Sequence, residues 1–577
     1  MDTDEIRNSL NRVVESLDIY NLPVDNALIY LLRIQDDRGR LPQLATGDVE
    51  LAHHLARESM DALTVLLPML YSRARKSKAF DLRDYRENNY HHAGRAIEIA
   101  SAYSHVSSAL TISDAGVYKI VRGKNKIYFV PSASAMRRDA SSQVLNVRDA
   151  RSFNVDKIYR PSASLLTMLS KHIEPGKSAL VSYKPSGALN IKIPEDLGEE
   201  LSKIFSAALM TRWTLNDEIQ IADYTVGEAK RLWTSLVKLC GFQQVFSLAS
   251  GKSGLGMQYL PMVLEQRDLC AFLATDTGVS THKSMEFIED LIFNNRITTN
   301  EVMFQPILRA DKRHILMFSP TLVLFSNPER NLMKLWSKRY QGAYGKKIAQ
   351  RGVEEERKLS EKIRRRFSQW NVVCSKKIEV NGQVLTDVDL GIYDRSNGEV
   401  FFGQVKWNIQ PDSFVEVSAL DTKLNDGMDQ LDVLTEYIRT HPNAYTTIFG
   451  EPINNIRSTS AAVISTSSIG SFWAHKKYPV YSARIFTDTL AENVASLNQL
   501  LEKVKKKHSF KSYIDYRNVF EVISLDSVDY YIPGTHVCDK PRPWQRILRA
   551  VQYFFFSFLL RDHYLTWDKQ HVMRIFG

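Results

Sequence analysis

Residues 386–407 read TDVDLGIYDRSNGEVFFGQVKW, and this stretch decides the fold of the region around it. Apolar residues alternate along two segments, which predicts two β-strands joined by a turn at 396–398. Two registers are open. A two-residue Asn-Gly turn puts Asp389 opposite Lys406, and a register slipped by one step on each strand puts Asp389 opposite Gln404. Because side chains alternate between the faces of a strand, both registers place Asp389, Gln404 and Lys406 on one face.

The other face of the predicted hairpin is apolar and is expected to lie in the core, with Val388, Leu390, Ile392, Phe401 and Val405. The polar face is suited to metal-assisted phosphodiester hydrolysis. Asp389, the Gln404 side-chain carbonyl and the Val405 backbone carbonyl offer hard oxygen ligands to Mg²⁺. Lys406 is expected to orient or deprotonate the attacking water, or to offset charge in the transition state. The alternative is that these polar residues belong to an ordinary solvent-exposed strand face.

This arrangement resembles the PD-(D/E)XK restriction-endonuclease-like superfamily, in which an Asp on one strand and an acid-x-Lys on the next hold the metal. The form Gln-x-Lys is similar to the Mrr-type branch. The resemblance covers roughly residues 340–490 and assigns the catalytic residues Asp389, Gln404 and Lys406. It departs from the common pattern at Gln404, because a neutral amide binds Mg²⁺ less strongly than a carboxylate does.

The resemblance also implies a helix with a glutamate before the hairpin. Residues 352–359 open a helical pattern whose apolar stripe is Val353, Leu359, Ile363 and Phe367. Glu356 precedes Leu359 by three residues and Ile363 by seven, which puts it beside that stripe. We favour Glu356 as the helix glutamate, and Glu354 and Glu355 are the alternatives.

The element order predicts an α+β multidomain protein with an αβββαβ restriction-endonuclease-like core, preceded by a largely helical N-terminal region. A chain of 577 residues has room for about three domains. We divide it into a helical region (1–115), a mixed α/β region of unknown role (116–330), a nuclease domain (331–505) and a C-terminal extension (506–577). The extension is expected to pack on the nuclease domain. Strands are expected at 313–318 and 321–325.

Composition indicates a globular protein, with 44% hydrophobic and 24% charged residues. The four cysteines are far apart with no Cys-x-x-Cys pair, which favours a reducing cytoplasm over a zinc finger or a disulfide framework. The polar N-terminus predicts no signal peptide. The longest apolar run, 551–560, is shorter than the roughly 20 residues of a membrane span, so no membrane association is expected.

The net charge of +10 is unevenly distributed. Residues 331–370 contain twelve Lys and Arg against four Glu, and a second basic cluster comprises Lys503, Lys505–Lys507 and Lys511. Such segments beside a metal site suit a polyanionic substrate, although a solvated helix face has the same composition. The adjacent pairs His53-His54 and His91-His92 have no His or Cys at ligand spacing, so we interpret them as ordinary helix residues.

The sequence therefore predicts a nuclease dependent on Mg²⁺ or Mn²⁺, above all a DNA endonuclease. The resemblance implies a setting in bacterial restriction or phage defence. Partners would be nucleic acid, further copies of the chain, or a partner protein of a defence system. Two alternatives stay open: a nuclease that cleaves RNA, and a catalytically weak or inactive module that binds nucleic acid or protein.

Overall fold

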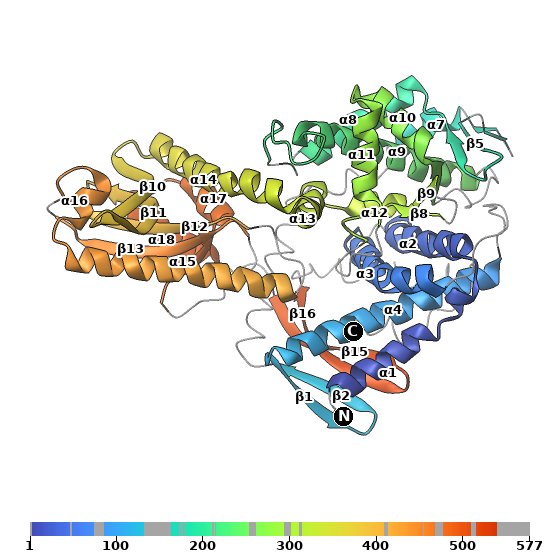
Figure 1. Cartoon of the computed structure of the whole chain (residues 1–577), viewed down its shortest axis with the longest axis horizontal. Helices are drawn as coiled ribbons and strands as arrows, with labels where there is room; N and C mark the ends of the chain where they lie inside the picture. Colours follow the sequence, from blue (N-terminus) through green and yellow to red (C-terminus); the bar gives the residue numbers. More distant parts are fainter. Residues whose placement is uncertain are drawn as a thin grey trace, which may run out of the picture.

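The computed structural model describes residues 3–46, 49–73, 86–131, 163–171, 173–174, 177–178, 180–210, 213, 215–252, 261–293, 302–310, 314–408, 414–453, 455–467, 477–508 and 515–538. The protein is a mixed α+β structure with several sheets, as the sequence predicts. Figure 1 shows the region of the decisive hairpin as a separate lobe, joined to the rest through a long helix.

The N-terminal region is helical, as predicted. Its helices are α1 (Thr3–Glu15), the 3-10 helix η1 (Asp18–Asn21), α2 (Val24–Thr46), α3 (Val49–Arg73) and α4 (Glu87–Asp114). In α1 the buried residues are Ile6, Leu10 and Val14, a spacing of four that lines one face of a helix.

A four-stranded sheet pairs a hairpin that follows the N-terminal helices with a hairpin at the C-terminal end of the described chain. Its hairpins are β1 (Tyr118–Gly123) with β2 (Lys126–Pro131), and β15 (Asp515–Leu525) with β16 (Val528–Cys538). β16 pairs in parallel with β2, giving the order β1-β2-β16-β15. Apolar residues of β15 share a buried cluster with α1 and α4. The expectation that the C-terminal extension packs on the nuclease domain is therefore wrong for its described part.

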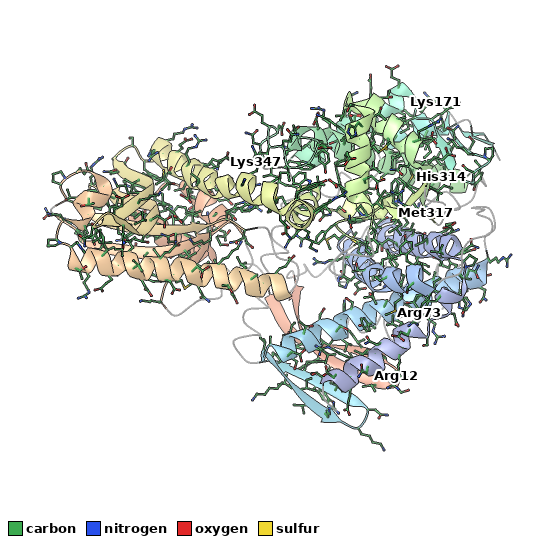
Figure 2. All side chains as sticks on the ribbon, in the orientation of Figure 1. Arg12, Arg73, Lys171, His314, Met317 and Lys347 are labelled. Atoms are coloured by element: carbon green, nitrogen blue, oxygen red, sulfur yellow. The ribbon has the colours of Figure 1, made fainter. Side chains whose placement is uncertain are left out.

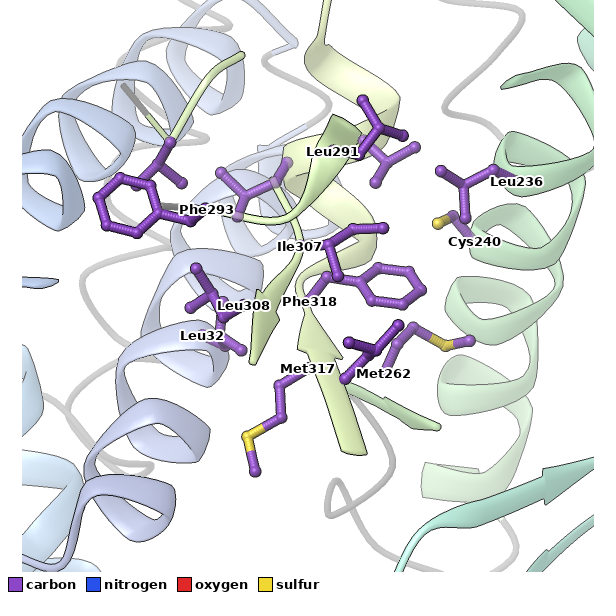
Figure 3. Packing of buried hydrophobic residues seen from close by; sticks show 14 of the residues in the cluster. Leu32, Leu236, Cys240, Met262, Leu291, Phe293, Ile307, Leu308, Met317 and Phe318 are labelled. Atoms are coloured by element: carbon purple, nitrogen blue, oxygen red, sulfur yellow. The ribbon is translucent and has the colours of Figure 1, made fainter. Parts of the chain in front are cut away.

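The middle region combines helices with short strands. Its elements are α7 (Ala163–Ser170), β3 (Ile173–Glu174), β4 (Lys177–Ser178), β5 (Val181–Tyr183), β6 (Leu189–Ile191), α8 (Glu195–Met210), α9 (Val226–Lys252), β7 (Met262–Glu265), α10 (Gln266–Thr277), α11 (Thr281–Leu291), β8 (Leu308–Arg309), β9 (Ile315–Phe318) and α12 (Pro320–Phe325). Figure 3 shows the sheet β7-β9-β8 between α2 and α9, with Leu32 on one side and Cys240 on the other. The N-terminal helices and the middle region share this core.

The strand predicted at 321–325 is wrong, because these residues form α12. Ser319 caps the helix by accepting a hydrogen bond from the Leu322 N–H, and Pro320 occupies its first turn. A serine cap followed by proline is a helix-start signal that outweighs the β-propensity of a short apolar run. The neighbouring strand prediction is confirmed over its described part by β9.

Two consecutive helices connect this core to the lobe with the hairpin: α13 (Pro328–Arg339) and α14 (Gln341–Arg366). Trp336 of α13 is buried in the N-terminal core. Arg351 of α14 lies 3.3 Å from Glu329 of α13, and its guanidinium stacks 4.9 Å from the centre of the Trp407 ring. Arg351 is buried. Arg351 therefore links Trp407, the residue after Lys406, to α13, which packs in the N-terminal core.

The lobe with the hairpin contains a five-stranded sheet. Its elements after α14 are β10 (Trp370–Val380), β11 (Gln383–Asp394), β12 (Glu399–Lys406), α15 (Phe414–Thr440), α16 (Ala444–Phe449), β13 (Ser458–Ser465), β14 (Val480–Ser482), α17 (Ala483–Leu490) and α18 (Leu497–His508). Strands β10, β11 and β12 are antiparallel, and β13 and β14 continue the sheet in parallel with β12. The order of a helix, three strands, a helix and a strand matches the prediction, and α16 is an additional helix before β13.

Both faces of this sheet are covered. Leu390, Ile392, Phe401 and Val405 pack with α14, α17 and α18, on the face that the sequence predicts to be apolar. The prediction is wrong for Val388, which belongs to the cluster under α15 on the opposite face, next to Gly391. Lys406 therefore lies beneath α15 instead of on an open sheet surface.

None of the helices in the described part of the chain is long and apolar enough to span a membrane. The apolar run 551–560 lies outside the described residues.

Candidate active site

The two strands of the hairpin pair from Asp394 with Glu399 down to Leu390 with Gly403. One further step in this register puts Asp389 opposite Gln404, which is the second of the two predicted registers. The Asn-Gly turn of the first register does not form. A four-residue turn, 395–398, takes its place. The Asp394 carboxylate stabilises this turn by accepting hydrogen bonds from the N–H groups of Ser396, at 3.1 Å, and Asn397, at 3.3 Å.

Beyond Leu390 and Gly403 the ladder between β11 and β12 ends, and side chains bridge the two strands. The Val405 N–H donates to Asp389 Oδ2 at 2.8 Å. Gln404 Nε2 donates to the backbone carbonyl of Asp387 at 2.8 Å. Because an extended residue directs its N–H and its C=O to the same side of a strand, the Val405 carbonyl also faces this opening.

Asp389 is almost fully buried in the opening, with 5% of its surface exposed. Burial raises the pKa of Asp389 to about 7, and the nearby charge of Glu356 adds to the effect, while Lys406 opposes it. Glu356 is also buried, and burial raises its pKa, although a hydrogen bond from Ser375 acts in the opposite direction. A buried acid whose pKa is raised by burial and by a neighbouring acid is a common feature of metal and catalytic centres.

The structure places Glu356, and not its two neighbours, beside the hairpin. Glu356 Oε2 accepts a hydrogen bond from Ser375 Oγ at 2.6 Å. Glu355 instead pairs with Lys358 along the helix surface at 3.1 Å. The predicted stripe is buried at Leu359, Ile363 and Phe367, but its first member is not, since Val353 is 55% exposed. The stripe starts later because the first half of α14 spans the connection between the two parts of the protein.

Lys406 reaches the same group of residues from β12. Its Nζ lies 3.9 Å from Asp389 Oδ2 and 3.4 Å from Gln404 Oε1, and it donates to Gln430 Oε1 on α15. Gln404 is fully buried. The interpretation of these residues as a solvent-exposed strand face is therefore wrong.

Gly427 of α15 makes room for the lysine. A Cβ atom at this position would lie 2.8 Å from Lys406 Cε and 3.4 Å from its Cγ. The helix can therefore pass directly over the lysine stem only because residue 427 has no side chain.

Two further residues belong to this group and were missed by the sequence analysis. Gln430 Nε2 donates to Asp387 Oδ1 at 3.3 Å while its oxygen holds Lys406. The charge of Asp387 in turn raises the pKa of Asp389 and that of Glu356. The available signal was the spacing of Gly427 and Gln430, which share one helix face, together with the alternation of Asp387 and Asp389 on one strand.

The donor set fits a hard divalent cation such as Mg²⁺ or Mn²⁺. The carboxylates of Asp387, Asp389 and Glu356 surround the opening, and the Val405 carbonyl faces it. Gln404 is less available than the sequence suggests. Its amide nitrogen donates to the backbone carbonyl of Asp387, and its oxygen lies 3.4 Å from the Lys406 amine. Two buried carboxylates and the partly buried Asp387, with one lysine, leave an excess of negative charge, which a divalent cation would neutralise.

The basic segments are partly used inside the protein. Arg364 donates to the Val372 carbonyl at 2.8 Å, and Lys507 contacts Glu492 at 2.6 Å. Lys347, Lys362 and Arg365 are exposed on α14, and Figure 2 shows Lys347 on the stretch of this helix between the two parts of the protein. Lys511 lies outside the described residues.

Comparison with family models, curated proteins and solved structures found no match to the chain. The function is therefore inferred from the geometry of the group itself.

Proposed function

We propose that residues 341–508 form a Mg²⁺-dependent nuclease that hydrolyses phosphodiester bonds in DNA. The observation that carries this proposal is the convergence of three carboxylates, Glu356, Asp387 and Asp389, with Lys406 where β11 and β12 separate. The helix α14 and the two strands of the hairpin bring these groups together. The order of elements and the Gln-x-Lys spacing support membership of the PD-(D/E)XK superfamily as part of the same proposal.

The carboxylates would hold the cation, which supplies Lewis-acid polarisation of the phosphate and of a bound water. Lys406 supplies a fixed positive charge beside the scissile phosphate and orients the attacking water. Gln430 and Gln404 hold the lysine amine in place through their side-chain oxygens. The Val405 N–H fixes the rotamer of Asp389, so the acid is positioned before substrate arrives.

The biological setting that we propose is bacterial restriction or phage defence, with residues 1–330 recognising a target or a trigger. The contacts of Arg351 with Glu329 and Trp407 support communication between the two parts, because they join the N-terminal core to the residue that follows Lys406. This setting rests on the family resemblance.

One substrate panel tests the function. Full-length protein is incubated with duplex DNA, single-stranded DNA and RNA of the same sequence, each with Mg²⁺, Mn²⁺ or EDTA. We expect cleavage of DNA with either metal, none with EDTA, and none by Asp389→Ala protein whose circular dichroism spectrum is that of the wild type. Cleavage of RNA alone would establish the RNA-cleaving alternative. Binding of nucleic acid without cleavage under all conditions would establish the non-catalytic one, which the engagement of Gln404 by Asp387 favours.

A further inference from the structure

A second group of metal-ligating side chains lies about the four-stranded sheet, in a different part of the protein from the hairpin. His54 and Glu58 are one turn apart on α3, His105 is on α4 and Glu521 is on β15. Figure 1 shows β15 lying along α4. Three segments that are far apart in the sequence thus contribute two imidazoles and two carboxylates.

The distances in this group are close to those of a coordination shell. One ligand atom each from Glu58, His105 and Glu521 lies within 4.8 Å of the other two. His105 Nδ1 is 3.7 Å from Glu521 Oε1, and His54 Nε2 is 3.1 Å from Glu58 Oε1. Two ligands on one tetrahedral zinc ion are roughly 3.4 Å apart, as follows from metal–ligand bonds of about 2.1 Å. Small side-chain movements would therefore close the shell.

The charges of the group also favour a cation. Two ionised carboxylates face two imidazoles. Their negative charge can be balanced by a proton on each imidazole or by one divalent ion. Arg38 contacts the second oxygen of Glu58, at 3.4 Å from Oε2. The other oxygen of Glu58, Oε1, is the one that faces His54. His and Glu one helical turn apart present their ligand atoms to the same point.

We propose that His54, Glu58, His105 and Glu521 form a structural Zn²⁺ site that fastens β15 to helices α3 and α4. Imidazole nitrogen with carboxylate oxygen is a ligand set that zinc accepts, whereas Mg²⁺ prefers oxygen ligands alone. Four protein ligands fill a tetrahedral shell, so the ion would stabilise the structure and take no part in catalysis. This site is independent of the proposed nuclease activity.

The test compares full-length variants that all carry Asp389→Asn, so that metal held in the hairpin opening is reduced equally in each. The protein is stripped with EDTA, dialysed against Zn²⁺ and then analysed for bound zinc and for its thermal midpoint. We expect one zinc ion fewer per chain in His105→Ala and in Glu521→Gln than in the parent. Zinc should raise the midpoint of the parent by several degrees and that of neither variant.

His91→Ala is the matched control. His91 is an exposed histidine on the same helix, 3.7 Å from Glu87 one turn away, and has no third ligand in the described cluster. Its zinc content should equal that of the parent. Glu521→Gln is conservative at a half-exposed side chain, which keeps the test valid if His105→Ala folds poorly. Co²⁺ should give tetrahedral absorption bands in the parent and in His91→Ala, and in neither His105→Ala nor Glu521→Gln. Equal zinc content in the parent, His105→Ala and Glu521→Gln would overturn the proposal and identify the group as protonated ion pairs.

Discussion

The ammonium nitrogen of Lys406 lies 3.9 Å from a carboxylate oxygen of Asp389, and the strands that carry the two residues no longer pair at this point. A lysine and an acid at this separation attract each other, but neither is in hydrogen-bonding contact with the other. The gap between them is bounded by the carboxylates of Glu356 and Asp387. The arrangement is suited to a cation and a phosphate more than to a simple ion pair.

Lys406→Ala should abolish most cleavage and leave metal binding in place. The substitution removes the fixed positive charge beside the phosphate, and loss of one such stabilising group lowers a rate by roughly 100-fold, whereas the carboxylates remain. Single-turnover cleavage and Mg²⁺ titration by calorimetry measure the two effects separately. Lys376→Ala, at an exposed lysine of β10, should cleave at the wild-type rate. Wild-type cleavage by Lys406→Ala would contradict the proposed role.

Glu356→Gln should weaken Mg²⁺ binding by about 10-fold, a typical loss for a group that supports a metal site. Among Glu354, Glu355 and Glu356, the buried glutamate is Glu356, and its charge raises the pKa of Asp389. Glu354→Gln, two residues earlier on the same helix, should bind Mg²⁺ like the wild type. If the two variants lose affinity equally, Glu356 has no special place at the site.

Gln404→Glu should lower the stability of the metal-free protein and raise its affinity for a metal ion. The carboxylate cannot donate to the Asp387 carbonyl, as the amide does, and loss of a buried hydrogen-bond partner costs about 1–3 kcal/mol. In EDTA the thermal midpoint should therefore fall by several degrees. With Mn²⁺ the variant should recover stability and retain cleavage, whereas Gln404→Ala should recover neither. An unchanged midpoint in EDTA would show that the amide hydrogen bond contributes little.

Gly427→Ala should reduce cleavage without reducing stability. The new Cβ would lie 2.8 Å from Lys406 Cε, so the flexible lysine must move and its amine leaves Gln430. Alanine is about 1 kcal/mol more favourable than glycine within a helix, which offsets the cost of that movement. Gly342→Ala, on α14 with open space around it, should gain stability and keep activity. Full activity of Gly427→Ala would mean that the position of the lysine is not critical.

The pH dependence of stability should report on Asp389 in metal-free protein. Burial, together with the charge of Glu356, raises the pKa of Asp389 from 3.8 to about 7. Between these two values the folded protein retains a proton that the unfolded chain has released, so stability falls as the pH rises through this window. Asp389→Asn removes the effect and should melt above the wild type at pH 8 in EDTA.

That difference should shrink as the pH falls toward 4. Mg²⁺ should reverse the order at pH 8, because the cation stabilises only the ionised carboxylate of the wild type. Thermal melts over this pH range, with and without Mg²⁺, measure both effects. A wild type that melts above Asp389→Asn at pH 8 in EDTA would exclude the raised pKa.

The hairpin and its helix could be predicted from sequence because their signals are local. Alternation with period two marks the two strands, and helical spacing places Glu356 beside Leu359. Gln430 and Asp387 escaped prediction because their importance comes from contacts across the fold, between α15 and the hairpin. The spacing of Gly427 with Gln430, and of Asp387 with Asp389, shows which side chains share a face, but it does not show which other element that face will meet.

The same limit explains the errors in the fold. The short apolar run at 321–325 suits a strand or a buried helix equally, and the Ser319-Pro320 start decided it. The C-terminal strands had no sequence signal for their neighbour, since β16 pairs with a strand about 400 residues earlier. The pair His53-His54 was interpreted as ordinary helix residues because it has no His or Cys at ligand spacing, whereas the group that contacts His54 is the Glu58 carboxylate one turn away.

The parallel pairing of β16 with β2 has a consequence for biosynthesis. The helix α1 buries Ile6 and Leu10 against a four-stranded sheet. The strands β15 and β16 of this sheet are made more than 380 residues after β1 and β2. During translation the N-terminal segment must therefore wait, with part of its apolar surface uncovered, while the lobe with the hairpin emerges from the ribosome and folds. A nascent chain halted before residue 515 would carry a finished lobe with the hairpin and an incomplete N-terminal sheet. Completion of this sheet therefore distinguishes a partial product from the full-length protein.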